Sequence, residues 1–177
     1  MLDPARSGSG EEDPVLKSSA KPSMSLPRAT YLLLLLDADN GAPIHGRTRL
    51  EKLAFIIQMK VIEGLHLGVT NESYEFRPFN YGPYTKEVLD DLVSLQMVGL
   101  AQIDGEPDTE QTFQITKQGQ AAVQRLLADK RIPPILVEEI RKVKTVYGKL
   151  SLDKLIGLVY SQWPEFTEKS EIKSRYF

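Results

Sequence analysis

The sequence predicts a mainly helical α+β domain of the winged helix-turn-helix class, with a two-stranded wing and additional helices after it. Three observations lead to this fold class. Apolar residues recur at helical spacing in three successive segments. Two short segments of alternating polarity then form a hairpin pattern. A further helix starts directly after the second of them, so helices, hairpin and helix follow one another in the winged-helix order.

The length of 177 residues fits one domain preceded by a tail. Residues 1–27 are rich in Ser, Pro and Gly and contain few large apolar side chains. Such a segment buries too little surface to offset the entropy lost on ordering, so we predict a disordered N-terminal tail. The winged-helix-like domain is expected over 28–177, with a C-terminal helical extension from about residue 130.

The first helix is predicted to begin near Tyr31, continue through the leucines at 32–36, and end at Asn40 and Gly41. Both of these residues tolerate left-handed backbone geometry.

The second helix is predicted over 49–62, with Gly64 as its end. Thr48 and Glu51 have the spacing of a capping box, in which each side chain binds the other residue's backbone amide. The residues expected on its buried face are Leu50, Leu53, Ala54, Ile57 and Val61.

A third helix follows the Gly82-Pro83 pair, and Pro83 suits the first position of a helix. The residues expected to be buried in it are Val88, Leu92 and Leu95, and Gly99 ends it. Residues 74–79, before this turn, fit a short strand or an extended loop.

The wing is predicted as a hairpin of 100–103 and 112–116 around a polar tip. Thr116 is expected to cap a fourth helix that runs to Leu127. Two more helices are expected over 134–147 and 151–162, the second one capped by Ser151.

These segments also resemble a known family. Residues 47–53 (Arg-Thr-Arg-Leu-Glu-Lys-Leu), the segment 79–84 (Phe-Asn-Tyr-Gly-Pro-Tyr) and the wing are similar to YwgA-like bacterial and archaeal proteins, and more distantly to the Panacea domain of SocA-like antitoxins. Residues 147–170 resemble the end of YwgA-like proteins, so the likeness covers most of 28–173. The YwgA-like resemblance implies no activity. The Panacea resemblance implies binding to a toxin or client protein, although this chain differs in its extra C-terminal helices.

Catalysis has little support in the sequence. The absence of cysteine excludes disulfides, thiolate catalysis and cysteine zinc sites. His45 and His66 lie in predicted loops without metal-ligand spacing, and Asp37 and Asp39 are explained by turn chemistry next to Asn40. No phosphate-binding glycine loop or nucleophile elbow is present. We therefore expect no enzyme activity, no cofactor and no metal.

The expected location is the cytoplasm. The longest apolar run has five leucines, far fewer than the roughly 20 residues of a membrane span, and no export signal is visible. We therefore expect no membrane interaction.

Nucleic-acid binding is the first alternative, with Arg47, Arg49, Lys52 and Lys86 as candidate phosphate-binding residues. For the first three we favour the alternative of a solvated helix face whose Arg49 and Lys52 pair with local acids. Residues 28–129 contain 9 basic and 14 acidic side chains, and 130–177 contain 10 and 6. The acids concentrate on the third helix and the wing tip, where they would repel phosphates. They are Glu87, Asp90, Asp91, Asp104, Glu106, Asp108 and Glu110.

A protein partner is the preferred hypothesis, with Phe79, Tyr81, Tyr84 and Trp163 as candidate partner-binding residues. Aromatic side chains bury a large area at low entropic cost, although packing against the core would also explain these four. The sequence thus predicts a non-enzymatic, antitoxin-like regulatory or adaptor module. Its protein partner could be encoded by a neighbouring gene, and a homodimer is a further option. A winged-helix DNA-binding transcriptional regulator is the alternative, and an unrecognised enzyme is a distant third.

Overall fold

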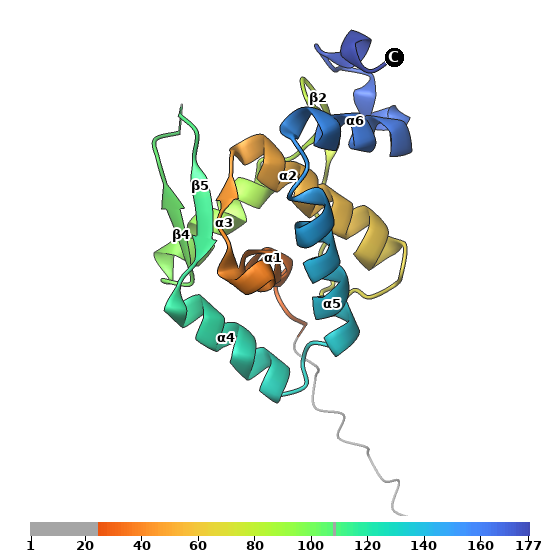
Figure 1. The fold of residues 1–177 in the computed structure, drawn as a ribbon. Helices are drawn as coiled ribbons and strands as arrows, with labels where there is room; N and C mark the ends of the chain where they lie inside the picture. Colours follow the sequence, from red (N-terminus) through yellow and green to blue (C-terminus); the bar gives the residue numbers. More distant parts are fainter. Residues whose placement is uncertain (1–24, 108) are drawn as a thin grey trace, which may run out of the picture.

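The computed structural model describes residues 25–107 and 109–177; most of the predicted tail, residues 1–24, lies outside them. The described part is a mixed α+β fold of helices packed around a central helix, with two small antiparallel sheets at its periphery (Figure 1). Its α-helices are α1 (Ala29–Gly41), α2 (Arg47–Ile56), α3 (Glu87–Met97), α4 (Lys117–Ala128), α5 (Pro134–Lys142) and α6 (Leu152–Gln162). Its strands are β1 (Ile44–His45), β2 (Arg77–Phe79), β3 (Gly82–Tyr84), β4 (Ala101–Asp104) and β5 (Thr112–Ile115).

Helix α1 lies at the centre of the molecule, between α3, α4, α5 and β5 (Figure 1). It is apolar on every side from Tyr31 to Leu36, and all six of these residues are buried, as expected for a helix enclosed by others. Helical geometry ends at Ala38, and Asp39, Asn40 and Gly41 have positive φ. The left-handed geometry predicted for Asn40 and Gly41 is therefore confirmed, and regular helical geometry stops shortly before them.

Helix α2 continues as a π-helical segment over Ile57–Glu63, so the predicted end at Gly64 is confirmed. The predicted capping box is wrong. The helix begins two residues early, after Gly46, and no side chain caps it. Glu51 instead accepts a bond from Arg47 one turn away. The five apolar residues predicted for the inner face are all buried.

The prediction that Pro83 begins the third helix is also wrong. Gly82–Tyr84 forms strand β3, which pairs with β2 so that Pro78 lies opposite Pro83. Proline lacks an amide hydrogen, but a short two-stranded ribbon tolerates it. Gly82 has φ +88°, and helix α3 begins only at Glu87. We call residues 77–84 the aromatic hairpin.

The second sheet has the strand order β1–β5–β4. The hairpin of β4 and β5 was predicted, whereas the two-residue strand β1 was not. The predicted cap of the fourth helix is confirmed, because the Thr116 side chain accepts a bond from the Gly119 amide at 3.0 Å. The last two predicted helices are confirmed as α5 with the π-helical segment Val143–Tyr147, and as α6 with Ser151 as its cap.

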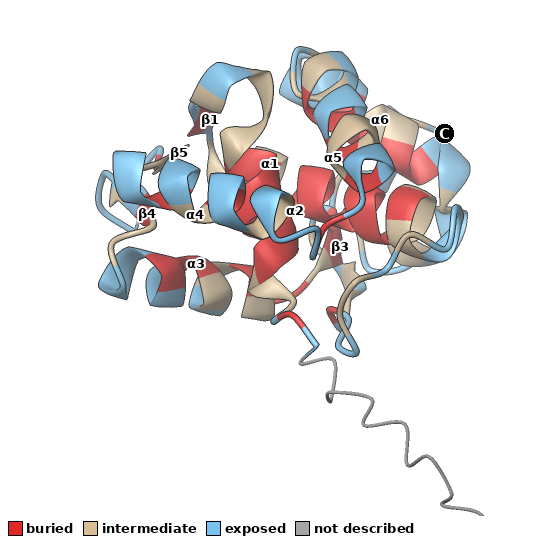
Figure 2. Ribbon diagram, turned by 90° about the horizontal axis from the view of Figure 1, so that it is seen from below, coloured by how far each residue is buried: buried red, intermediate tan, exposed pale blue. Residues whose placement is uncertain are grey.

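One continuous core holds these elements together. Buried residues gather along α1 and α2 in the middle of the molecule, while the outer helices turn exposed sides to solvent (Figure 2). Leu26, which the sequence placed in the tail, is buried in this core, so the fold begins slightly before residue 28. Among the described helices, none combines the length and the apolar character needed to cross a bilayer.

Gly82 generates a first prediction, because its positive φ disfavours a side chain and a Cβ there would come within 2.6 Å of the Tyr160 ring. We expect Gly82→Ala to lower the free energy of unfolding by about 2 to 4 kcal/mol, combining backbone strain with overpacking. Urea denaturation measures this change. Gly68→Ala is the control, since its Cβ would make only ordinary contacts. Equal stability of the two variants would contradict the prediction.

Candidate partner-binding surface

The aromatic hairpin exposes two large rings. Phe79 and Tyr81 each keep 48% of their surface exposed. Tyr84 lies beside Phe79 on the opposite strand, with ring centroids 4.9 Å apart and an interplanar angle of 31°. The hairpin therefore presents two partly exposed aromatic rings to solvent from a defined backbone.

Two hollows flank the hairpin. One, of about 450 Å³, is lined by Phe79 and Tyr84 together with charged side chains, which are the cations Arg77, Lys86 and Lys169 and the acids Glu75 and Glu87. The other, of about 520 Å³, has Tyr81 on its wall and is more apolar. The apolar side chains that line it, besides Tyr81, are Leu152, Ile156, Ile172 and Tyr176. The exposed rings thus stand between two concave areas of different character.

Helix α2 anchors the hairpin through buried polar groups. The Lys52 ammonium, only 1% exposed, donates to the Pro83 carbonyl at 2.8 Å. Burial lowers the pKa of Lys52 to about 8, and the neighbouring Glu51 carboxylate partly opposes this change. Arg47 pairs with Glu51 at 3.2 Å and donates to the Tyr84 hydroxyl at 3.4 Å. Burial raises the pKa of Glu51, although Lys52 and Arg47 favour its charged form.

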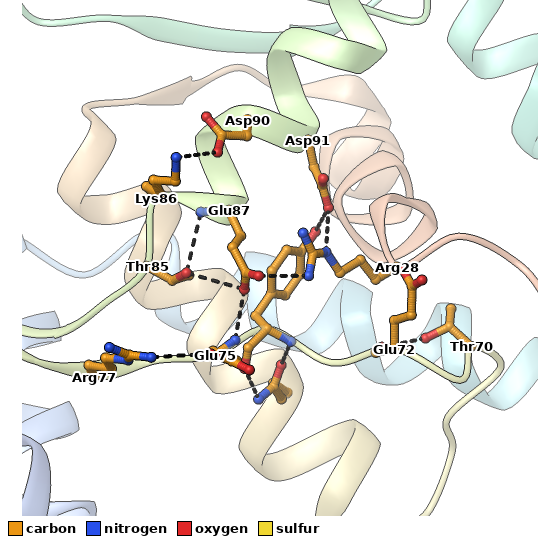
Figure 3. A network of polar contacts seen from close by, with 12 residues as sticks. Arg28, Thr70, Glu72, Glu75, Arg77, Thr85, Lys86, Glu87, Asp90 and Asp91 are labelled. Atoms are coloured by element: carbon orange, nitrogen blue, oxygen red, sulfur yellow. Dashed lines mark hydrogen bonds and ion pairs between the residues drawn. The ribbon is translucent and has the colours of Figure 1, made fainter.

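Arg28 fixes the segment that leads into the hairpin. Figure 3 shows its guanidinium reaching Glu87 and Asp91 of α3, at 3.0 and 2.9 Å. The second oxygen of Glu87 accepts the amide hydrogen of Glu75 at 2.8 Å. Burial disfavours the charged form of Glu87, yet the bonds from Glu75 and Arg28 lower its pKa overall. The chain before β2 is therefore held to α3 by charge-assisted hydrogen bonds.

This network corrects the expectation of a free acidic surface on α3. Glu87 and Asp91 face Arg28, and only Asp90 is exposed, 3.6 Å from the Lys86 ammonium. The remaining exposed face of α3 includes Val93 and Met97. In the wing, Asp104 accepts bonds from Gln102 and Gln114, Glu106 and Glu110 are exposed, and Asp108 lies outside the described residues.

The four candidate phosphate-binding residues do not form one surface. Lys52 is buried beneath the hairpin, which is incompatible with a phosphate contact in this conformation. Arg49 donates to the carbonyls of Gly148 and Leu150 at 3.0 and 2.6 Å. Neither Lys52 nor Arg49 therefore belongs to an exposed helix face that pairs with acids. Arg47 is partly exposed and paired with Glu51, while Lys86 is exposed beside the hairpin hollow.

The four candidate partner-binding residues do not form one surface either. Phe79, Tyr81 and Tyr84 share the hairpin, whereas Trp163 follows α6 and packs its ring edgewise against Phe55 at 5.1 Å. Trp163 is half-buried against the core, with the Lys60 ammonium 5.7 Å from its ring centroid. Sequence reasoning missed Lys169, whose proximity to the hairpin arises only through the fold.

His45 is exposed, and its ring lies 3.1 Å from the Thr112 hydroxyl. Within residues 25–107 and 109–177, no three His, Asp or Glu side chains are grouped so that they could hold a metal ion.

The chain matches no protein-family model and no curated protein with which it was compared.

The lowered pKa of Lys52 generates a second prediction. Its pKa falls from an ordinary value of 10.5 in the unfolded chain to about 8 in the fold, so the unfolded chain binds more protons between these values. Stability therefore rises with pH across this interval. Relative to Lys52→Met, the wild type should gain about 2 kcal/mol between pH 8 and pH 10.

Urea denaturation of both proteins across this range provides the measurement. At neutral pH the two stabilities should lie close together, because methionine removes a buried charge but leaves the Pro83 carbonyl without its donor. Lys86→Met, at an exposed position, is the control. A stability difference between wild type and Lys52→Met that does not vary with pH would contradict the prediction.

Proposed function

We propose that this protein is a non-enzymatic, antitoxin-like adaptor or regulatory module that binds a protein partner through its aromatic hairpin. The observation that carries the proposal is the pair of half-exposed rings, Phe79 and Tyr81. They lie on a hairpin that buried polar contacts fix to helix α2. Binding energy at protein interfaces concentrates in a few aromatic and arginine side chains that fill pockets on the partner.

Prior ordering of the hairpin supports this role. Lys52 and Arg47 hold β3 from one side, and the Arg28 network holds the segment before β2 from the other. A partner therefore loses little conformational entropy at the hairpin when it binds, and rigid anchors gain affinity in this way. The flanking hollows add concave area next to the rings.

Within the mixed α+β class, the specific fold that we propose is a winged helix over α1 to β5. Its support is the element order α1, β1, α2, α3, β4, β5 and the sheet order β1–β5–β4, in which the strand after the first helix joins the wing. The aromatic hairpin is then an insertion between the second and third helices. The sequence resemblance to YwgA-like and Panacea proteins supports the same fold, and the more distant Panacea resemblance alone supports a protein partner.

DNA-binding regulation remains the second candidate, favoured by the exposed cations Arg77, Lys86 and Lys169 around one hollow. The exposed face of α3, however, includes Gln96 as a side chain that can read base edges but no Arg or Lys, and Asp90 on the same helix would repel phosphates. We therefore place the protein partner first.

Site-specific photocrosslinking in the native host tests the proposal. A photoreactive amino acid at position 81 should crosslink one defined protein, whereas the same group at exposed position 124 on α4 should not. Phe79→Ala, with the crosslinker retained at 81, should reduce the yield by about tenfold, the loss typical of one interface anchor.

Two outcomes would overturn the proposal. Equal crosslinking from positions 81 and 124 would show that the hairpin is not the contact surface. Crosslinks to nucleic acid at 81, together with duplex binding that weakens steeply as salt rises, would favour the DNA-binding alternative.

A further inference from the structure

A third hollow, separate from the aromatic hairpin, lies where four parts of the chain meet. It has a volume of about 320 Å³, near the lower end for small-molecule sites. The end of α1, strand β1, helix α2 and the turn at 148–150 form its walls, and Glu110 of the wing tip reaches its edge. No residue that lines it also lines either hollow at the hairpin.

Arg49 gives this hollow a specific chemistry. Its Nη1 donates to the carbonyls of Gly148 and Leu150, which hold one end of the guanidinium in place. Its Nε and Nη2 have no partner among the described residues. Every buried side-chain nitrogen in the described part of the chain has a partner, so this free edge must be reached by solvent. Two parallel N–H groups of this kind match the two oxygens of a carboxylate or phosphate.

The charges around Arg49 favour an anion. Lys144 is buried and donates to the carbonyls of Leu36 and Ala38 at 3.0 and 2.8 Å. Asp39 lies 4.0 Å from Lys149 and interacts favourably with Lys144, so its own charge is already balanced. Among the acids that line the hollow, only the exposed Glu110 then opposes Arg49.

We propose that this hollow binds a small oxyanion of metabolite size, a carboxylate or a phosphate ester, through the free edge of Arg49. Lys149, 4.0 Å from Asp39, offsets that acid and so keeps it from repelling the anion. The walls come from both the first helices and the C-terminal extension, so a bound ligand would contact both parts of the fold at once. This site is independent of the hairpin and does not rest on the proposed partner function.

Titration of the ¹⁵N-labelled full chain with succinate, phosphate and neutral succinamide tests the proposal by NMR at low ionic strength. Succinate or phosphate should shift the amide signals of residues 45–49 and 148–150, and succinamide should not. The tighter of the two anions identifies the head group. The proposal fails if neither anion binds, if succinamide binds equally well, or if the shifts lie elsewhere.

Two variants give the site a quantitative test. Arg49→Lys keeps the charge but removes the paired donors, and it should weaken anion binding by about tenfold. Arg125→Lys, at an exposed position of α4 outside the hollow, is the matched control and should leave affinity within about twofold. Equal effects of the two substitutions would overturn the proposal.

Lys149→Gln keeps the test valid if Arg49→Lys fails to fold, because Lys149 is exposed and contributes no backbone contact. This variant should fold normally by circular dichroism and bind the anion roughly threefold more weakly. Unchanged affinity in this variant would contradict the role assigned to Lys149.

Discussion

A buried ammonium group and the carbonyl that it binds position the exposed surface of this protein. Lys52 lies on the inner face of α2, and its hydrogen bond to Pro83 ties the aromatic hairpin to the central helices. Burying a lysine is unfavourable, as its lowered pKa indicates, and a methionine of similar length would fill the same space. The polar contact therefore specifies where β3 lies rather than adding much stability. Phe79 and Tyr81 can then be exposed without the hairpin collapsing onto them.

Much of the fold could be predicted from local patterns. The apolar run at 32–36 gave α1, the wing followed from its alternating polarity, and the Thr116 and Ser151 caps located the starts of α4 and α6. The region between α2 and α3 could not be predicted in the same way. The Gly82-Pro83 pair is compatible with a helix start and with a strand, and antiparallel pairing with Phe79 and Pro78 in a tight hairpin decided between them.

The candidate site was predictable only in part. The aromatic residues of 79–84 stood out because exposed rings next to a rigid turn are a recognisable pattern. The roles of Arg49 and Lys52 did not stand out, because a basic residue at a helix start gives no sign that its partner is a main-chain carbonyl far along the chain. Arg28 was likewise missed, so Glu87 and Asp91 were counted as free surface charges. Pairing across 59 and 63 residues is a property of the fold and has no local signature.

Amide hydrogen exchange tests most directly whether Lys52 organises the hairpin. In Lys52→Met, the amides of Arg77, Phe79, Gly82 and Tyr84 should exchange markedly faster than in the wild type, while those of the buried helix α1 keep their protection. The account predicts this local loss without global unfolding. Unchanged protection at all four hairpin amides in a folded variant would contradict it, because the hairpin would then be held without its buried lysine.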